Sequence, residues 1–175
     1  MPAKGFVCRR CGACCRGEGS VFLYPEDIVA IAAHLALPRQ ETVDRYADFV
    51  ILEIPEEGGS WLYLPYLVLR KDEAHTCLFL RERLCAIHDA KPAQCRETPF
   101  VAEFFDDAAW RADLLRACPA LREADPASLP AAVGLATADR DHRYRDLLRE
   151  HAYDLERILS VTLPAPRLIA AAELS

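Results

Sequence analysis

Four cysteines within eight positions constrain this chain more than any other feature of its sequence. They are Cys8, Cys11, Cys14 and Cys15, in the stretch CRRCGACC. The segment is polar and rich in arginine, so the four thiols cannot all be core residues. A C-x-x-C pair lets two thiolates converge on one ion while the backbone N–H groups between them point at the sulfurs. The stretch therefore predicts metal ligation by these four residues.

The cysteine spacing suits two kinds of metal centre. Cys8, Cys11 and Cys14 form a C-x2-C-x2-C run, which binds three corners of a cubane cluster in bacterial ferredoxins. Cys118 is followed by a proline, as is the remote fourth cysteine of those ferredoxins. Gly12 instead favours a zinc knuckle, because it supplies the freedom that a tight turn needs. The pattern favours an iron–sulfur cluster of the 4Fe–4S type, and zinc stays open as the alternative because thiolate sites accept both.

Composition narrows the class of protein. The 175 residues are 52% hydrophobic and 27% charged, as in an ordinary globular protein. The formal net charge of −6 argues against general nucleic-acid binding, which needs a basic face. No stretch approaches the ~20 apolar residues of a membrane span, and the first residues carry no apolar signal segment. We therefore expect a cytoplasmic protein without a membrane partner, whose eight cysteines are not a disulfide framework.

The pattern along the chain predicts an α+β fold in a small single domain, with short β-hairpins and cysteine-rich loops around the metal. The domain is expected to cover residues 1–175, because this length is typical of one domain. All eight cysteines precede residue 119. The metal-binding part is therefore expected over about 5–121, followed by a C-terminal helical extension over about 139–175.

Apolar spacing and turn residues place the expected elements. Helical spacing predicts helices at 25–50, divided into 24–35 and 39–50, and a C-terminal helix at about 139–160. We expect the apolar stripe of that last helix to pack in the core, although an exposed stripe would be a docking face for a protein partner. The other expected elements are hairpins over 51–70 and 77–88, a loop with one helical turn at 89–100, a helix or a strand pair at 101–117, and a short helix at 164–174.

The order of motifs resembles a known family. CRRCGACC, YPEDI, CLFL, CAIHDAKPAQCRETPF and ACPAL follow one another from Cys8 to about Leu121. This series resembles the YkgJ-like, CxxCxxCC family of zinc- or iron-chelating proteins, whose pattern has eight cysteines. By spacing alone, Cys77, Cys85 and Cys95 could equally be packing residues. The resemblance implies that all eight cysteines are metal ligands: Cys8, Cys11, Cys14, Cys15, Cys77, Cys85, Cys95 and Cys118.

Residues near Cys95 match a second element of the family. Pro92, Arg96 and Pro99 fit its RP-x-x-CR-x-PF motif, with Lys91 where the family usually has arginine. Four thiolates around one zinc ion leave a charge of −2, so nearby cations and hydrogen-bond donors lower the cost of the site. We expect Arg96 to supply such a donor to the metal-bound sulfurs.

Eight thiolates would fill two four-coordinate sites, or one cluster and one zinc site. Adjacent side chains diverge, so Cys14 and Cys15 are expected to serve two neighbouring sites. His75 and His88 could each add a ring nitrogen, but we expect ordinary histidines because eight thiols suffice. The resulting partition is one site of Cys8, Cys11, Cys14 and Cys118, and another of Cys15, Cys77, Cys85 and Cys95.

Several functions are compatible with such a metal centre. The first is metal chelation with a redox or metal-handling role, and the second is an interaction module in which zinc only stabilises the loops for a protein partner. Relatives of the family include the flagellin lysine N-methylase, but the chain has no G-x-G-x-x-G fingerprint, so an accessory domain related to that methylase is a distant alternative. Lewis-acid catalysis would need an open coordination position, which eight thiolates in two sites do not leave. Whether the protein is an enzyme stays open.

Overall fold

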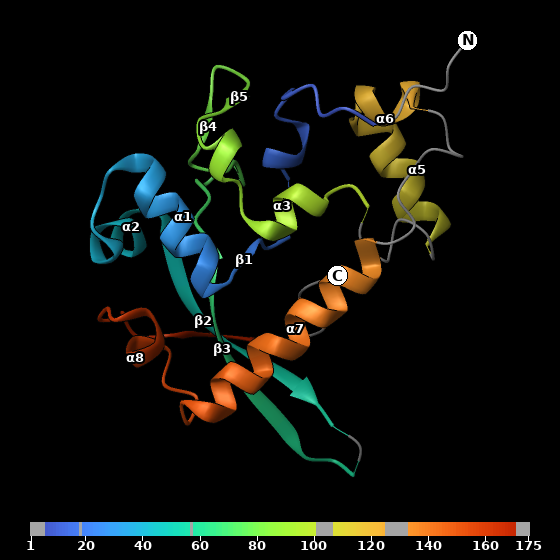
Figure 1. Cartoon of the computed structure of the whole chain (residues 1–175). Coiled ribbons are helices and arrows are strands. Elements are labelled where there is room, and N and C mark those ends of the chain that lie inside the picture. The colour runs from blue at the N-terminus through green and yellow to red at the C-terminus, as the bar shows by residue number, and fades with distance from the viewer. Residues whose placement is uncertain (1–5, 18, 57, 101–106, 125–132, 171–175) are drawn as a thin grey trace.

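A β-hairpin forms the centre of the protein in a computed structural model (Figure 1). β2 (Ala47–Pro55) and β3 (Trp61–Leu69) pair antiparallel along their whole length. β1 (Phe22–Leu23) pairs with β3, and β6 (Arg167–Ala170) pairs parallel with β2, which gives the order β1-β3-β2-β6. The residues that the structure describes are 6–17, 19–56, 58–100, 107–124 and 133–170.

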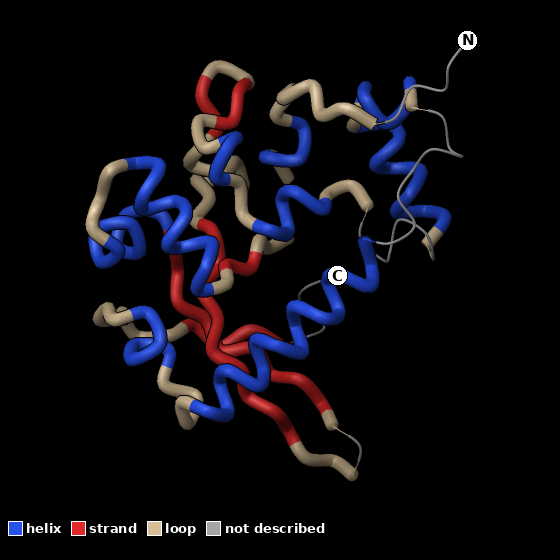
Figure 2. The backbone as a smooth tube through the Cα atoms, in the orientation of Figure 1, coloured by secondary structure: helices blue, strands red, loops and turns tan. Residues whose placement is uncertain are grey.

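Helices cover both faces of this sheet (Figure 2). α1 (Pro25–Leu35), α2 (Arg39–Tyr46) and α8 (Leu155–Leu159) contribute to one hydrophobic cluster with the strand residues of one face. α7 (Val133–Glu150) packs against the other face. The predicted α+β fold is therefore confirmed.

The apolar stripe of the C-terminal helix lies in the core. Tyr144 is 3% exposed and Leu148 is completely buried, in a cluster with Val50 and Tyr66 of the hairpin. The Tyr144 hydroxyl donates a hydrogen bond of 2.6 Å to the carbonyl oxygen of Pro65 in β3. α7 is thus fixed over the sheet by packing and by one buried hydrogen bond.

Three elements differ from their predicted extents. The second predicted helix ends at Tyr46, and its last residues begin β2 because Ala47–Val50 pair with β3. The C-terminal helix stops at Glu150, because Ala152 and Tyr153 adopt left-handed φ angles of 53° and 61°, and α8 then starts a new helix. The described part of the predicted helix at 164–174 contains strand β6 at Arg167–Ala170 and no helix, so that prediction was wrong for these residues.

Short elements form the cysteine-bearing part of the fold. They are η1 (Ala13–Cys15), β4 (Leu80–Arg81), β5 (Leu84–Cys85), η2 (His88–Ala90), α3 (Ala93–Glu97), α5 (Ala108–Ala117) and α6 (Pro119–Glu123). The second hairpin and the helical turn of α3 agree with their predictions. The ambiguous segment 101–117 is helical where it is described, while 101–106 lie outside the described residues. Within the described ranges, no helix combines the length and the apolar character needed to cross a bilayer.

Candidate metal centre

The loop that contains the first four cysteines lies against the hairpin of β4 and β5. Gly12 adopts a φ of 73°, and a Cβ at this position would stand 2.6 Å from Leu80 Cδ1 and 3.0 Å from the carbonyl oxygen of Arg83. A larger residue would therefore be strained and would displace the loop. This close approach brings the cysteines of η1 to the cysteine at the end of the hairpin.

The Cys15 thiol contacts the thiols of both Cys14 and Cys85. Hydrogen bonds with Cys15 lower the pKa of Cys14 from 9.0 to about 6 and the pKa of Cys85 from 9.0 to about 6. The same hydrogen bonds raise the pKa of Cys15. Cys15 is thus the donor in this group, and its two neighbours are the sulfurs whose thiolate form is favoured.

Two further thiols lie close to this group. The backbone N–H of Cys77 donates to the carbonyl oxygen of Cys15 over 2.8 Å, and burial raises the pKa of Cys77. Burial also raises the pKa of Cys95 to about 12, and that thiol interacts electrostatically with Cys14, Cys77 and Cys85. Five thiols from separate parts of the sequence therefore lie near each other.

The remaining cysteines lie on the side of α6. Cys118 is the residue before α6, and burial raises its pKa. Its thiol interacts electrostatically with Cys11 and Cys14. Cys8 is exposed and is not among the interacting thiols described above. Cys14 is thus close both to the group around Cys15 and to Cys118.

Backbone N–H groups point at the sulfurs of three later cysteines. The donors are Phe79 for Cys77, Ile87 for Cys85, and Leu121 together with Ala120 for Cys118. Such donors stabilise a thiolate, and hydrogen bonds to sulfur are also a means by which proteins tune metal clusters. The donor set therefore fits a thiolate-bound metal. In the part of the chain that the structure describes, no three Cys, His, Asp or Glu side chains already converge on a common metal position.

The positive charge of Lys91 lowers the pKa of three of these thiols. Its charge adds to the hydrogen bonds that lower the pKa of Cys14 and Cys85, and it opposes the burial that raises the pKa of Cys95. Arg96 is exposed, and its guanidinium donates to the carbonyl oxygen of Lys91. The role expected for Arg96 stays a prediction. Sequence reasoning did not select Lys91, although its place in the family motif was an available signal.

The two histidines near the cysteines differ in their surroundings. His88 Nδ1 lies 3.4 Å from Asp89 Oδ1, while its Nε2 is buried and has no hydrogen-bond partner among the described residues. His75 is exposed in a turn, with a φ of 54°. Of the two, only His88 has a buried nitrogen that is available for another contact.

These observations define a small α+β protein with a cluster of cysteine thiols between short loops. The family model CxxCxxCC, described as a "putative zinc- or iron-chelating domain", matches residues 7–120. This match covers more than half of the chain, so the protein belongs to the CxxCxxCC family, and the resemblance seen in the sequence is confirmed. The family description supports metal binding, with zinc or iron as the metal. No curated protein and no solved structure matches the chain significantly.

Proposed function

We propose that this protein chelates zinc or iron through eight cysteine thiolates at two adjoining sites, and that an iron–sulfur cluster is the native occupant of one of them. The position of Cys14 is the observation that carries this proposal. Its sulfur is hydrogen-bonded to Cys15, beside Cys85, and also interacts with Cys118. One residue of a short loop therefore lies between the two groups of thiols.

We divide the eight proposed ligands into two sites that adjoin between Cys14 and Cys15. One site would use Cys8, Cys11, Cys14 and Cys118, and the other would use Cys15, Cys77, Cys85 and Cys95. The C-x2-C-x2-C run and the Cys-Pro sequence favour the cluster in the first site. Backbone N–H donors to the sulfurs and the charge of Lys91 would offset the negative charge of the ligands in the second. A bound cluster would supply one-electron redox chemistry, whereas bound zinc would hold the loops together.

Metal analysis of anaerobically purified protein tests the proposal. We expect iron and acid-labile sulfide, with the broad visible absorption of a thiolate-bound cluster. A colourless protein with about two zinc ions per chain would contradict the cluster but not chelation. A protein that retains neither metal after purification, and binds neither on reconstitution, would overturn the whole proposal.

Two substitutions test how the ligands divide. Cys118→Ser is expected to abolish metal binding at the first site, and Cys77→Ser at the second, so each variant is the matched control for the other. Each should lose one kind of metal centre and keep the other, as measured by metal content and visible spectrum. Unchanged metal content in Cys118→Ser would show that the partition is wrong.

A redox or metal-handling role, a cytoplasmic location and a protein partner belong to the same proposal. The support for the location comes from the sequence, because eight thiols that serve as ligands need a reducing compartment.

A further inference from the structure

Arg140 lies on α7, outside the segment 7–120 that matches the family, yet it contacts the helix that contains Cys95. We propose that Arg140 is a positioning residue for the metal centre: its ion pair with Glu97 fixes α3 and thereby the direction of the Cys95 thiol. This inference rests on the proposed function, because it takes Cys95 as a ligand.

The ion pair is largely buried, and a single guanidinium nitrogen makes it. Arg140 Nη2 lies 2.5 Å from both carboxylate oxygens of Glu97. The side chains are only 9% and 15% exposed. Buried charges that lose a partner are strongly destabilising, so the two side chains are held together. Glu97 is the last residue of α3 and lies two positions after Cys95.

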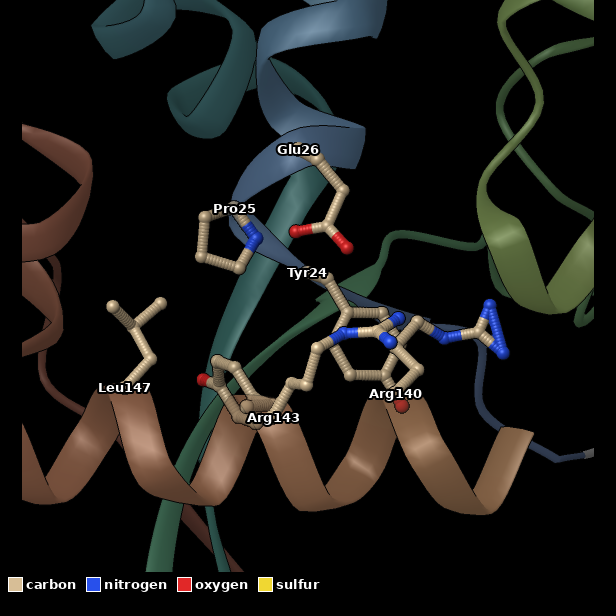
Figure 3. A pocket seen from close by; sticks show the side chains of 7 residues that line it. Tyr24, Pro25, Glu26, Arg140, Arg143 and Leu147 are labelled. Carbon is tan, nitrogen blue, oxygen red and sulfur yellow. The ribbon is translucent and has the colours of Figure 1, made fainter. Parts of the chain in front are cut away.

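The position of Arg140 is itself fixed by its neighbours. One turn further along α7, Tyr144 is buried against β3 and bonded to it. The Arg140 guanidinium lies 5.0 Å from the centre of the Tyr24 ring, a cation–π distance. The Tyr24 hydroxyl donates to Asp141, the next residue of α7. Figure 3 shows Tyr24 between the start of α1 and α7, with Arg140 beside it.

α3 needs such contacts because it is only five residues long. A helix of this length is not stable alone in water. At its first residue, the backbone N–H of Ala93 donates to Asp27 Oδ1 over 2.9 Å. At its last residue, Glu97 pairs with Arg140. Cys95 lies between these two contacts, so its thiol direction depends on both ends of α3.

A charge-neutral double substitution tests the role of the pair. Arg140→Met with Glu97→Gln removes the ion pair without leaving a buried charge unpaired. The matched control is Arg143→Met with Asp139→Asn, which removes an ion pair from the same helix where both side chains are exposed, at 66% and 61%. Two quantities are measured in each variant and in the wild type. One is the rate of Cys95 alkylation in the metal-free protein, by peptide mass spectrometry, and the other is the Kd for Zn²⁺ by competition with a chelator.

We expect the Arg140/Glu97 variant to keep its far-UV circular dichroism, to alkylate faster at Cys95 and to bind Zn²⁺ about 10-fold more weakly, as for other residues that orient metal ligands. The control variant should match the wild type in both measurements. Arg140→Lys, which keeps the charge but loses the planar guanidinium over the Tyr24 ring, should give intermediate values, and it replaces the double variant if that protein does not fold.

Wild-type values for both quantities in the Arg140/Glu97 variant would overturn the proposal. Equal changes in the control variant would also overturn it, because removal of any ion pair on α7 would then be enough to change Cys95 alkylation and zinc binding. Failure of the proposed function is distinguishable: the wild type would bind no Zn²⁺, which removes the role in a metal centre, while faster Cys95 alkylation would still show that the pair positions α3.

Discussion

Gly12 determines where the first cysteines lie relative to the β4–β5 hairpin. Its left-handed backbone and the short distance to the Arg83 carbonyl oxygen leave no room for a side chain. Gly17 has a similar φ of 97°, but no atom lies within 4 Å of where its Cβ would be. The two glycines therefore separate the effect of backbone strain from the effect of a close contact.

Gly12→Ala is expected to lower the free energy of unfolding by about 1–2 kcal/mol through backbone strain and to displace the loop from the hairpin as well. Gly17→Ala should show the strain alone. Urea unfolding and zinc retention check both: only Gly12→Ala should also weaken zinc retention. Equal zinc retention in the two variants would show that the contact with the hairpin does not matter.

The low pKa of Cys14 predicts an unusual reactivity in the metal-free protein. The Cys15 hydrogen bond lowers the pKa of Cys14 to about 6, and Cys14 is exposed. Its alkylation rate should therefore rise between about pH 5 and pH 7 and then level off, because the thiolate is the reactive form. In Cys15→Ala the rise should move to higher pH. A wild-type rate that climbs only near the ordinary pKa of 9.0 would contradict the assignment.

At the scale of elements, the start of α1 also supports α3. Asp27 is 2% exposed, and its carboxylate accepts the N–H of Tyr24 over 3.1 Å and that of Ala93 over 2.9 Å. As a carboxylate in the first turn of α1, Asp27 caps the helix through the first of these bonds. The second joins two elements that are distant in the sequence.

Asp27→Ala is expected to lower the free energy of unfolding by about 2–4 kcal/mol, since it removes a helix cap and leaves buried N–H groups without acceptors. The check is the urea midpoint at an unchanged m-value. Glu26→Ala is the matched control, because Glu26 is the exposed neighbouring carboxylate and should cost within about 0.5 kcal/mol. A similar midpoint for both variants would contradict this account.

Local sequence patterns predict the hairpins and α1. They fail where pairing with a strand that is distant in the sequence determines the secondary structure. Residues 39–50 keep helical spacing throughout, but Ala47–Val50 form strand because β3 offers them a paired edge. The segment around Leu168 is short and apolar, and only its parallel pairing with β2 makes it a strand. The proposed thiol ligands follow from residue type and the family pattern. The role of Arg140 does not follow from the sequence, because its contact with Glu97 joins segments that are 43 residues apart.

For the whole molecule, α7 joins the sheet to the thiol-bearing helix α3. Tyr144 contacts the sheet and Arg140 contacts Glu97. Loss of metal should therefore be coupled to loss of the whole fold. We expect zinc release and far-UV circular dichroism to follow a single thermal transition, and free zinc at 100 times its Kd to stabilise the protein by about 2.7 kcal/mol. Zinc release well before the loss of helix would contradict this coupling.

Pro65 affects how the edge of β3 could pair with a strand of another molecule in solution. The N–H of Leu69 donates to the carbonyl oxygen of Val21 over 2.8 Å. Backbone groups of alternate strand residues point to the same edge, so those of Leu67 and Pro65 also point to the edge of β3 that pairs with β1. β1 covers only Leu67 and Val68. Pro65 has no N–H, and its carbonyl oxygen already accepts the Tyr144 hydroxyl.

A strand from another molecule would thus meet an interruption in the middle of this edge. Light scattering at high protein concentration should rise in Pro65→Val with Tyr144→Phe, and unchanged scattering would count against the idea. If the prediction holds, the tyrosine that fixes α7 over the sheet also protects the concentrated protein from edge-to-edge aggregation.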